Sequence, residues 1–142
     1  MKTCVSFADL VEIHRPQIEE MQRVGHAFSD PTAPNAGDAF SHQVKLVEGT
    51  LRQTYREAAA LAKRTLDLEE VKEIWSQMSA FCGATIQALT TLKGKYPGCA
   101  TPRLYDLALD FKLAADKRYR DVLEEISCQS QEYPKGLFPG SK

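Results

Sequence analysis

Residues 40–61, FSHQVKLVEGTLRQTYREAAAL, carry the clearest periodicity in the chain. Apolar or small side chains recur at steps of three and four residues, at Phe40, Val44, Val47, Leu51, Tyr55, Ala58 and Leu61. This spacing places them on one face of an α-helix, whereas a half-buried strand would alternate every second residue. The stretch therefore predicts a long amphipathic helix that buries a single face.

Helical spacing also fills most of the remaining chain, and no segment of four or more residues alternates convincingly between apolar and polar. We expect four helices, over about 7–28, 39–64, 68–95 and 102–128. The connection after the second helix is only two or three residues long, so the second and third helices are expected to be antiparallel neighbours. The sequence therefore predicts an all-α, antiparallel up-down-up-down four-helix bundle.

Capping signals mark the expected helix starts. Ser6 and Asp9 have the spacing of a capping box, in which each side chain satisfies a backbone donor at the helix start. Asp38, Asp67 and Thr101 can each cap the helix that follows them.

Pro16 lies inside the first predicted helix, where it removes a backbone donor and crowds the carbonyl of Glu12. We expect a kink near His14, with the apolar face keeping its phase on both sides. His14 falls on or beside that face, and we expect a partly buried ring whose nitrogen is satisfied locally. No catalytic role is assigned to it.

The chain has 142 residues, the length of a single domain. Its last segment, residues 131–142 (QEYPKGLFPGSK), contains two prolines and two glycines and is expected to be non-helical. We therefore expect residues 1–130 to form the bundle and 131–142 to form an extended tail. Docking of this tail on the bundle would use Leu137 and Phe138.

The charge balance and the absence of motifs limit the classes of function that this chain can have. Eighteen Lys and Arg residues face 19 Asp and Glu residues, a formal net charge of −1 that offers no basic surface for nucleic acid. Asp9 and Glu12 precede any apolar run long enough for a signal peptide, so we expect a cytoplasmic protein. No phosphate-binding loop, nucleophile elbow or His-Glu-x-x-His motif occurs, so we expect a non-enzymatic protein without a cofactor.

Residues 74–92, IWSQMSAFCGATIQALTTL, contain no charged side chain. Their Ser, Gln, Thr and Gly content is too polar for a membrane span. One face of this helix is expected to point inward, at Val71, Trp75, Met78, Cys82, Thr85, Leu89 and Leu92. The opposite face lacks charge after Glu73, which is unusual for the solvent face of a bundle helix.

Small side chains on that opposite face would let another helix approach closely. We expect a protein–protein interface here, formed by Ser76, Ala80, Gly83, Ala84, Gln87 and Thr91. A homodimer is the simplest occupant, because a two-fold axis pairs one surface with a copy of itself. The alternatives are coverage by the C-terminal tail, a different protein partner, or a central position of this helix in a distorted bundle.

A second hypothesis concerns the segment HQVK, from His42 to Lys45. It resembles the acceptor region of histidine-containing phosphotransfer domains, which are four-helix bundles with an exposed histidine near a lysine and a glycine. The resemblance implies that His42 accepts a phosphoryl group, with Lys45 as cationic support. The sequence departs from that pattern where Leu46 replaces a small residue and Gly49 follows Lys45 only after four positions.

A third hypothesis is metal or small-ligand binding at one end of the bundle, where His26, His42 and Cys99 are expected to meet. These side chains suit zinc, although their spacing matches no zinc-binding motif.

The four cysteines form no CxxC pair, so we expect free thiols in a reducing compartment. Cys4 and Cys128 fall at the same end of the expected bundle and could pair if oxidised. Cys82 lies mid-helix, too far from Cys99 for a disulfide.

Overall fold

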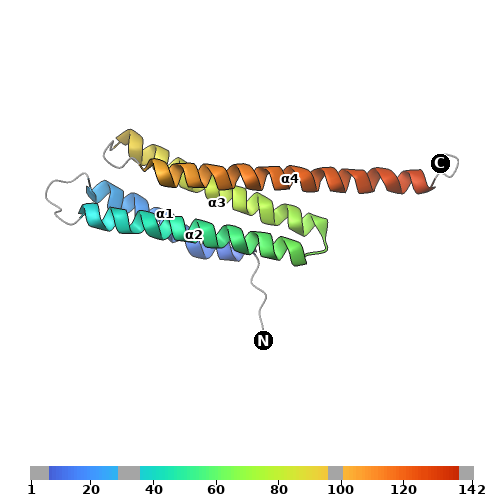
Figure 1. Ribbon diagram of the computed structural model, residues 1–142, viewed down its shortest axis with the longest axis horizontal. Coiled ribbons are helices and arrows are strands. Elements are labelled where there is room, and N and C mark those ends of the chain that lie inside the picture. The colour runs from blue at the N-terminus through green and yellow to red at the C-terminus, as the bar shows by residue number, and fades with distance from the viewer. Residues whose placement is uncertain (1–6, 29–35, 96–100, 138–142) are drawn as a thin grey trace, which may run out of the picture.

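The computed structural model describes residues 7–28, 36–95 and 101–137. Its helices are α1 (Phe7–Phe28), α2 (Ala36–Arg64), α3 (Leu68–Lys95) and α4 (Pro102–Leu137). Consecutive helices run in opposite directions, and these three ranges contain no strand (Figure 1). The predicted all-α, up-down four-helix bundle is therefore confirmed.

The helices pack as two antiparallel pairs, α1 with α2 and α3 with α4 (Figure 1). The pairs meet mainly through α1 and α3, which run parallel to each other. α2 and α3 are antiparallel and in contact, as predicted, but this contact is smaller than the one between α1 and α3. α3 consequently has the most extensive packing of the four helices.

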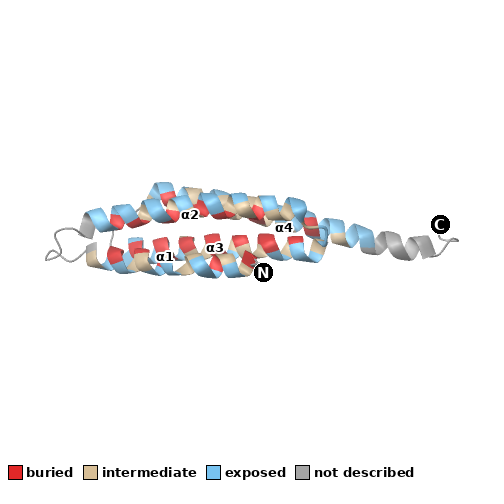
Figure 2. Ribbon diagram, turned by 90° about the horizontal axis from the view of Figure 1, so that it is seen from below, coloured by how far each residue is buried: buried red, intermediate tan, exposed pale blue. Residues whose placement is uncertain are grey.

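The buried side chains form one continuous core on the facing sides of the helices (Figure 2). Every residue predicted on the inward face of α3 is buried, at Val71, Trp75, Met78, Cys82, Thr85, Leu89 and Leu92. On α2 the predicted face either lies in the core or packs against it, at Phe40, Val44, Val47, Leu51, Tyr55, Ala58 and Leu61. The two periodic segments thus bury the faces that their spacing predicted.

An aromatic cluster joins α2, α3 and α4 inside this core. The Tyr55 ring stacks on Phe111, with centroids 4.7 Å apart, and meets the Trp75 ring at 5.6 Å. The Arg118 guanidinium lies over Trp75, 5.3 Å from the ring centroid, which shields the edge of the cluster from water. Such ring pairs have preferred geometries, so the cluster fixes how α4 sits along α2 and α3.

α1 continues unbroken through Pro16, and Val11 before it and Ile18 after it are both buried. The apolar face therefore keeps its phase, as predicted. His14 is half-buried, but its Nδ1 is buried without a hydrogen-bond partner among the described residues. The prediction of local satisfaction was therefore wrong for Nδ1. Pro16 frees the carbonyl of Glu12 as an acceptor, but helical residues two positions apart face different directions, so the His14 ring does not bond to it.

The start of α3 follows the predicted cap. Asp67 Oδ1 accepts a hydrogen bond from Glu69 N at 3.0 Å, which satisfies one of the free donors of the first turn. α2 begins at Ala36, so Asp38 lies inside its first turn, where a carboxylate still interacts favourably with the helix dipole. Ser6 lies outside the described residues.

Thr101 does not cap α4 in the predicted way. Its carbonyl accepts the first helical hydrogen bond, from Tyr105 N at 3.0 Å. Its hydroxyl is buried and has no partner within the described ranges. Thr101 instead lines a hollow between α3 and α4, together with Leu89 and Pro102. It therefore contributes to packing and not to capping.

α4 is longer than the sequence predicted, since it continues past Cys128 to Leu137. The prediction of a non-helical tail was therefore wrong for residues 131–137. Pro134 removes one backbone hydrogen bond, yet the helix continues through it to Leu137. The end of α4 runs on along its own axis past α3 (Figure 1), and Phe138 lies outside the described residues.

Gly25 is a point of close approach that the sequence did not reveal. A Cβ at this position would lie 2.8 Å from Leu92 Cδ2 and 3.1 Å from Phe40 Cε1. α1, α2 and α3 therefore converge here at a separation that leaves no room for a larger residue unless its neighbours move.

We expect Gly25→Val to destabilise the fold by about 1–3 kcal/mol, because a branched side chain overpacks the space beside Phe40 and Leu92. Gly49 is the matched control, since a Cβ there meets nothing within 4 Å. Gly49→Ala should stabilise α2 by up to about 1 kcal/mol through its higher helix propensity. Denaturant unfolding measures both effects, and a Gly25→Val protein as stable as the wild type would contradict the close approach.

Candidate interaction surface

The outer face of α3 consists of Ser76, Ala80, Gly83, Ala84, Gln87 and Thr91, the residues predicted to form an interface. Ala80, Gln87 and Thr91 are exposed, while Ser76, Gly83 and Ala84 are partly buried. No helix of the described chain therefore covers the middle of this face. Within the described residues the bundle therefore covers this face in part, at Ser76, Gly83 and Ala84, and leaves Ala80, Gln87 and Thr91 open. None of the described helices is apolar over a length that could cross a membrane.

The neighbouring helices border the outer face on two sides. A Cβ added to Gly83 would lie 3.5 Å from Lys112 Cε, so Gly83 marks the border with α4. Ala84 marks the opposite border, where it faces α1 together with the buried Ala88. The exposed strip of the outer face therefore runs between Gly83 and Ala84.

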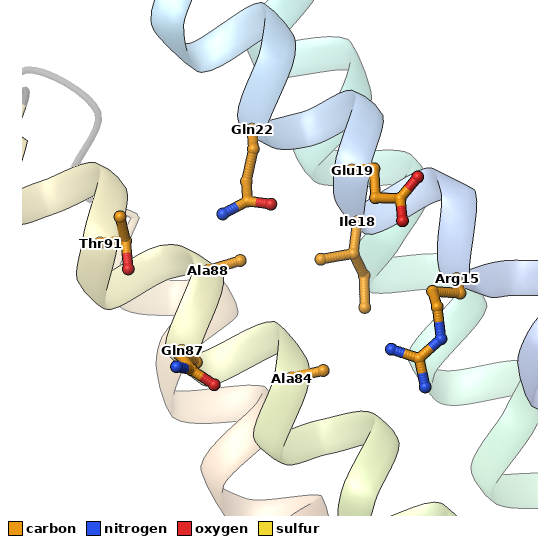
Figure 3. A pocket seen from close by; sticks show the side chains of 8 residues that line it. All are labelled: Arg15, Ile18, Glu19, Gln22, Ala84, Gln87, Ala88 and Thr91. Atoms are coloured by element: carbon orange, nitrogen blue, oxygen red, sulfur yellow. The ribbon is translucent and has the colours of Figure 1, made fainter.

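A groove of about 280 Å³ lies along the α1 border. Its α3 wall combines Ala84, Gln87 and Thr91 of the outer face with the buried Ala88. Its α1 wall, which was not predicted, consists of Arg15, Ile18, Glu19 and Gln22. Figure 3 shows Ile18 and Gln22 directed from α1 toward α3. The groove thus has a small apolar floor and a rim of amide, hydroxyl and charged groups. Such a surface can accept both an apolar contact and hydrogen bonds from a partner.

The α1 wall could not be found from the sequence. In the sequence, Arg15 and Glu19 are charged residues of the kind expected on the solvent side of a helix. In the structure, Arg15 Nε pairs with Glu12 Oε2 at 3.2 Å. Their place beside Gln87 depends on the parallel packing of α1 against α3. No local pattern encodes that packing.

Charge is distributed unevenly along α3. Glu69, Glu70 and Glu73 are exposed near its start, and Lys93 and Lys95 are exposed near its end. Within the helix, Lys72 Nζ lies 2.9 Å from Glu69 Oε1, and this hydrogen bond raises the pKa of the Lys72 ammonium. Gln77 Nε2 donates to Glu73 Oε2 at 3.3 Å, and Glu73 forms no salt bridge among the described residues, although its charge acts on the nearby Lys72.

A polar link holds α3 against α4 below the outer face. Ser79 Oγ donates to Asp116 Oδ1 at 2.5 Å, and Lys112 Nζ donates to Asp116 Oδ2 at 2.9 Å. Burial by itself would raise the pKa of Asp116, but the hydrogen bonds from Ser79 and Lys112 outweigh it and the pKa is lowered. The ionised carboxylate is therefore the form that the link favours.

We expect Asp116→Asn to destabilise the protein by about 1 kcal/mol at pH 7, because it weakens two charge-assisted hydrogen bonds. The folded pKa lies below the ordinary value of 3.8, so the stabilisation is present above that pH and is lost as pH falls through the folded pKa. The difference between variant and wild type should therefore shrink in acid. Urea unfolding at pH 7 and below pH 3.8 measures it.

Asp110→Asn is the control for this experiment, since Asp110 is exposed on the same helix. It should change stability little at either pH. A loss for Asp116→Asn that is equal at both pH values would show that the Asp116 charge does not stabilise the link.

Cys82 lies in the core next to this link. Burial raises the pKa of its thiol to about 12, more than the nearby Lys112 charge lowers it. Cys82 therefore stays a neutral thiol and is no nucleophile. Cys82 and Cys128 are free, with Cys128 exposed, while Cys4 and Cys99 lie outside the described residues, so the Cys4–Cys128 pairing stays a prediction.

The predicted metal set is only partly described. His26 and His42 are exposed at the end where α1 finishes and α2 begins (Figure 1), and Cys99 lies outside the described residues. Within the ranges that the structure covers, no three His, Cys, Asp or Glu side chains gather closely enough to hold a metal ion. The phosphoacceptor candidate His42 and its neighbour Lys45 both face solvent.

Comparison with known proteins found no relative of this chain. The chain has no significant match to a protein-family model, to a curated protein or to a solved structure.

Proposed function

We propose that this protein is a non-enzymatic interaction module that self-associates through the outer face of α3. The observation that carries the proposal is the outer face of α3, which is exposed at Ala80, Gln87 and Thr91 and carries no charge between residues 74 and 92. About a quarter of the residues in the chain are charged. An exposed helix face that served only to contact water would normally carry charge.

The side chains of the outer face support close contact with another helix. Ala80 and Ala84 have small side chains, so a second backbone can approach the strip between Gly83 and Ala84 closely. Gly83 itself lies beside Lys112 at the α4 border. Ser76, Gln87 and Thr91 can donate and accept hydrogen bonds at the edge of such a contact. A surface with both properties is suited to a protein partner more than to a small molecule.

A second copy is the simplest partner, because a two-fold axis brings the same surface from both chains together. A different protein with a similar small-residue helix is the competing occupant. The two partners differ in one measurable property, since only self-association changes the mass of the pure protein.

The test is sedimentation velocity on the pure protein from about 1 to 100 µM, a range that brackets weak and moderate dimers. We expect a concentration-dependent dimer, and we expect Ala80→Glu to shift the chain to monomer because the new charge would lose its water in the contact. Ala60→Glu is the matched control, since Ala60 is an exposed helical alanine on α2. It should leave dimerisation unchanged.

Two results would overturn the homodimer. One is a wild-type protein that stays monomeric over the whole range, and the other is a dimer that Ala80→Glu and Ala60→Glu weaken equally. Circular dichroism of both variants establishes that each remains helical.

Phosphoryl transfer to His42 is the second candidate, favoured by one observation. Gln43 is buried and its Nε2 donates to the Gln17 carbonyl at 3.0 Å, which fixes the rotation of α2 and turns His42 outward. Lys45 is exposed one turn further on, where its ammonium could attract a phosphoryl donor. The imidazole would attack phosphorus and displace the donor's leaving group, with the proton lost to solvent.

Acetyl phosphate is the probe for this candidate. Phosphotransfer predicts an acid-labile mass increase of one phosphoryl group that disappears in His42→Gln and persists in His26→Gln, where the other exposed histidine is lost. No incorporation, or incorporation that His42→Gln does not reduce, removes phosphotransfer as a function.

A further inference from the structure

The exposed charges of α3 are arranged as two ends of opposite sign. The first turns carry the exposed Glu69, Glu70 and Glu73, with the half-buried Lys72 paired to Glu69 among them. The last turn carries Lys93 and Lys95. No charged side chain separates the two groups, because residues 74–92 are uncharged. The outer face of α3 is therefore flanked by an acidic end and a basic end.

We infer that the second copy docks on the outer face of α3 in the antiparallel direction, with a two-fold axis that crosses the helix between Gly83 and Ala84. This inference rests on the proposed self-association and adds its orientation and its register. It makes each chain's acidic end the partner of the other chain's basic end.

Charge complementarity selects the antiparallel direction. In that arrangement Glu73 of each copy lies next to Lys95 of the other, while Lys93 borders the hollow beside α4. A parallel pair would place Glu73 next to a second Glu73. The two ends of α3 lie about 30 Å apart at 1.5 Å per residue, well beyond the screening length of about 8–10 Å at physiological salt. Each end therefore acts independently, and an antiparallel dimer gains two favourable contacts where a parallel dimer gains two unfavourable ones.

The charges needed for these contacts are free to make them. Glu73 accepts its hydrogen bond from the uncharged Gln77 and forms no salt bridge within the described residues, although the nearby Lys72 ammonium interacts with its charge. The same residues contain no ion pair of Lys95. Docking would therefore break no existing ion pair at these positions. The dipoles of two antiparallel helices also oppose each other, which favours the same direction.

The register follows from the size of the side chains. An axis between Gly83 and Ala84 places Ala80 opposite Gln87 and places Ser76 opposite Thr91. The smallest residues then lie at the crossing point, where the two backbones come closest, and the hydrogen-bonding side chains lie further out. Gly83 at the α4 border and Ala84 at the α1 border leave the strip between them open for the partner helix.

Cross-linking of introduced cysteines tests this arrangement in a full-length chain with Cys4, Cys99 and Cys128 changed to serine. This chain keeps only the buried Cys82 beside the introduced cysteine. Ala84 lies beside the axis, so the two copies of an Ala84→Cys chain differ in height by only about 1.5 Å and should form a disulfide. The two copies of a Thr91→Cys chain are about 22 Å apart along the helix, so they should not. A mixture of Ser76→Cys and Thr91→Cys chains should cross-link, although neither does so alone.

The outcomes separate the orientation from the dimer itself. A dimer that cross-links through Thr91→Cys alone is parallel and overturns the inference, as does a dimer that cross-links at none of these positions. A chain that remains monomeric in sedimentation and forms no disulfide overturns the proposed function as well.

Charge reversal gives an independent readout that needs no cysteine. Glu73→Lys alone and Lys95→Glu alone should each weaken the dimer about three- to tenfold, since each reversal affects two contacts at a surface ion-pair strength. The double variant should regain wild-type affinity, because it restores opposite charges. Glu124→Lys, on the exposed side of α4, is the control and should change nothing. A Glu73→Lys protein that dimerises as well as the wild type contradicts the antiparallel direction.

Discussion

Burial of the inward face of α3 against the other three helices is the interaction on which the rest of the structure depends. Trp75 and Met78 lie in the middle of this face and are almost fully enclosed. Each such side chain contributes about 1.5–3 kcal/mol when removed from water, so the face supplies much of the stability of the core. Because α4, α1 and α2 pack against α3, one side of α3 remains open among the residues that the structure describes. The outer face is thus a consequence of how the core is built.

The parts that hold α3 in place also set the orientation of this open side. Gly25 lets α1 and α2 come close to Leu92 near one end of the helix. The Ser79–Asp116 hydrogen bond fixes the helix against α4 on the other side. A helix rotated by even a third of a turn would present a different set of residues to a partner, so this anchoring is what makes a defined interface possible. The groove beside Ala84 exists only because α1 packs parallel to α3.

The structure differs from the sequence prediction at three places, where a local signal for a helix end, a cap or a hydrogen bond did not decide the conformation. Pro134 and Gly136 favoured a helix end, yet α4 continues through both to Leu137, so these residues did not decide where the helix ends. Thr101 had the chemistry of a cap, but its side chain packs between α3 and α4 instead of reaching the backbone. His14 was expected to satisfy its ring nitrogen locally, which the geometry of residues two apart on a helix does not allow.

The sequence by itself determined the four helices, their alternating directions and the inward faces of α2 and α3, because these follow from the spacing of apolar residues and from short connections. It also identified the uncharged segment 74–92, since absence of charge is a property of composition. Only the tertiary structure decided which residues border the outer face and that Arg15, Glu19 and Gln22 of α1 share its groove. The physical reason is that periodicity specifies which side of a helix is buried, whereas the identity of its neighbours depends on how side chains from distant segments fit together.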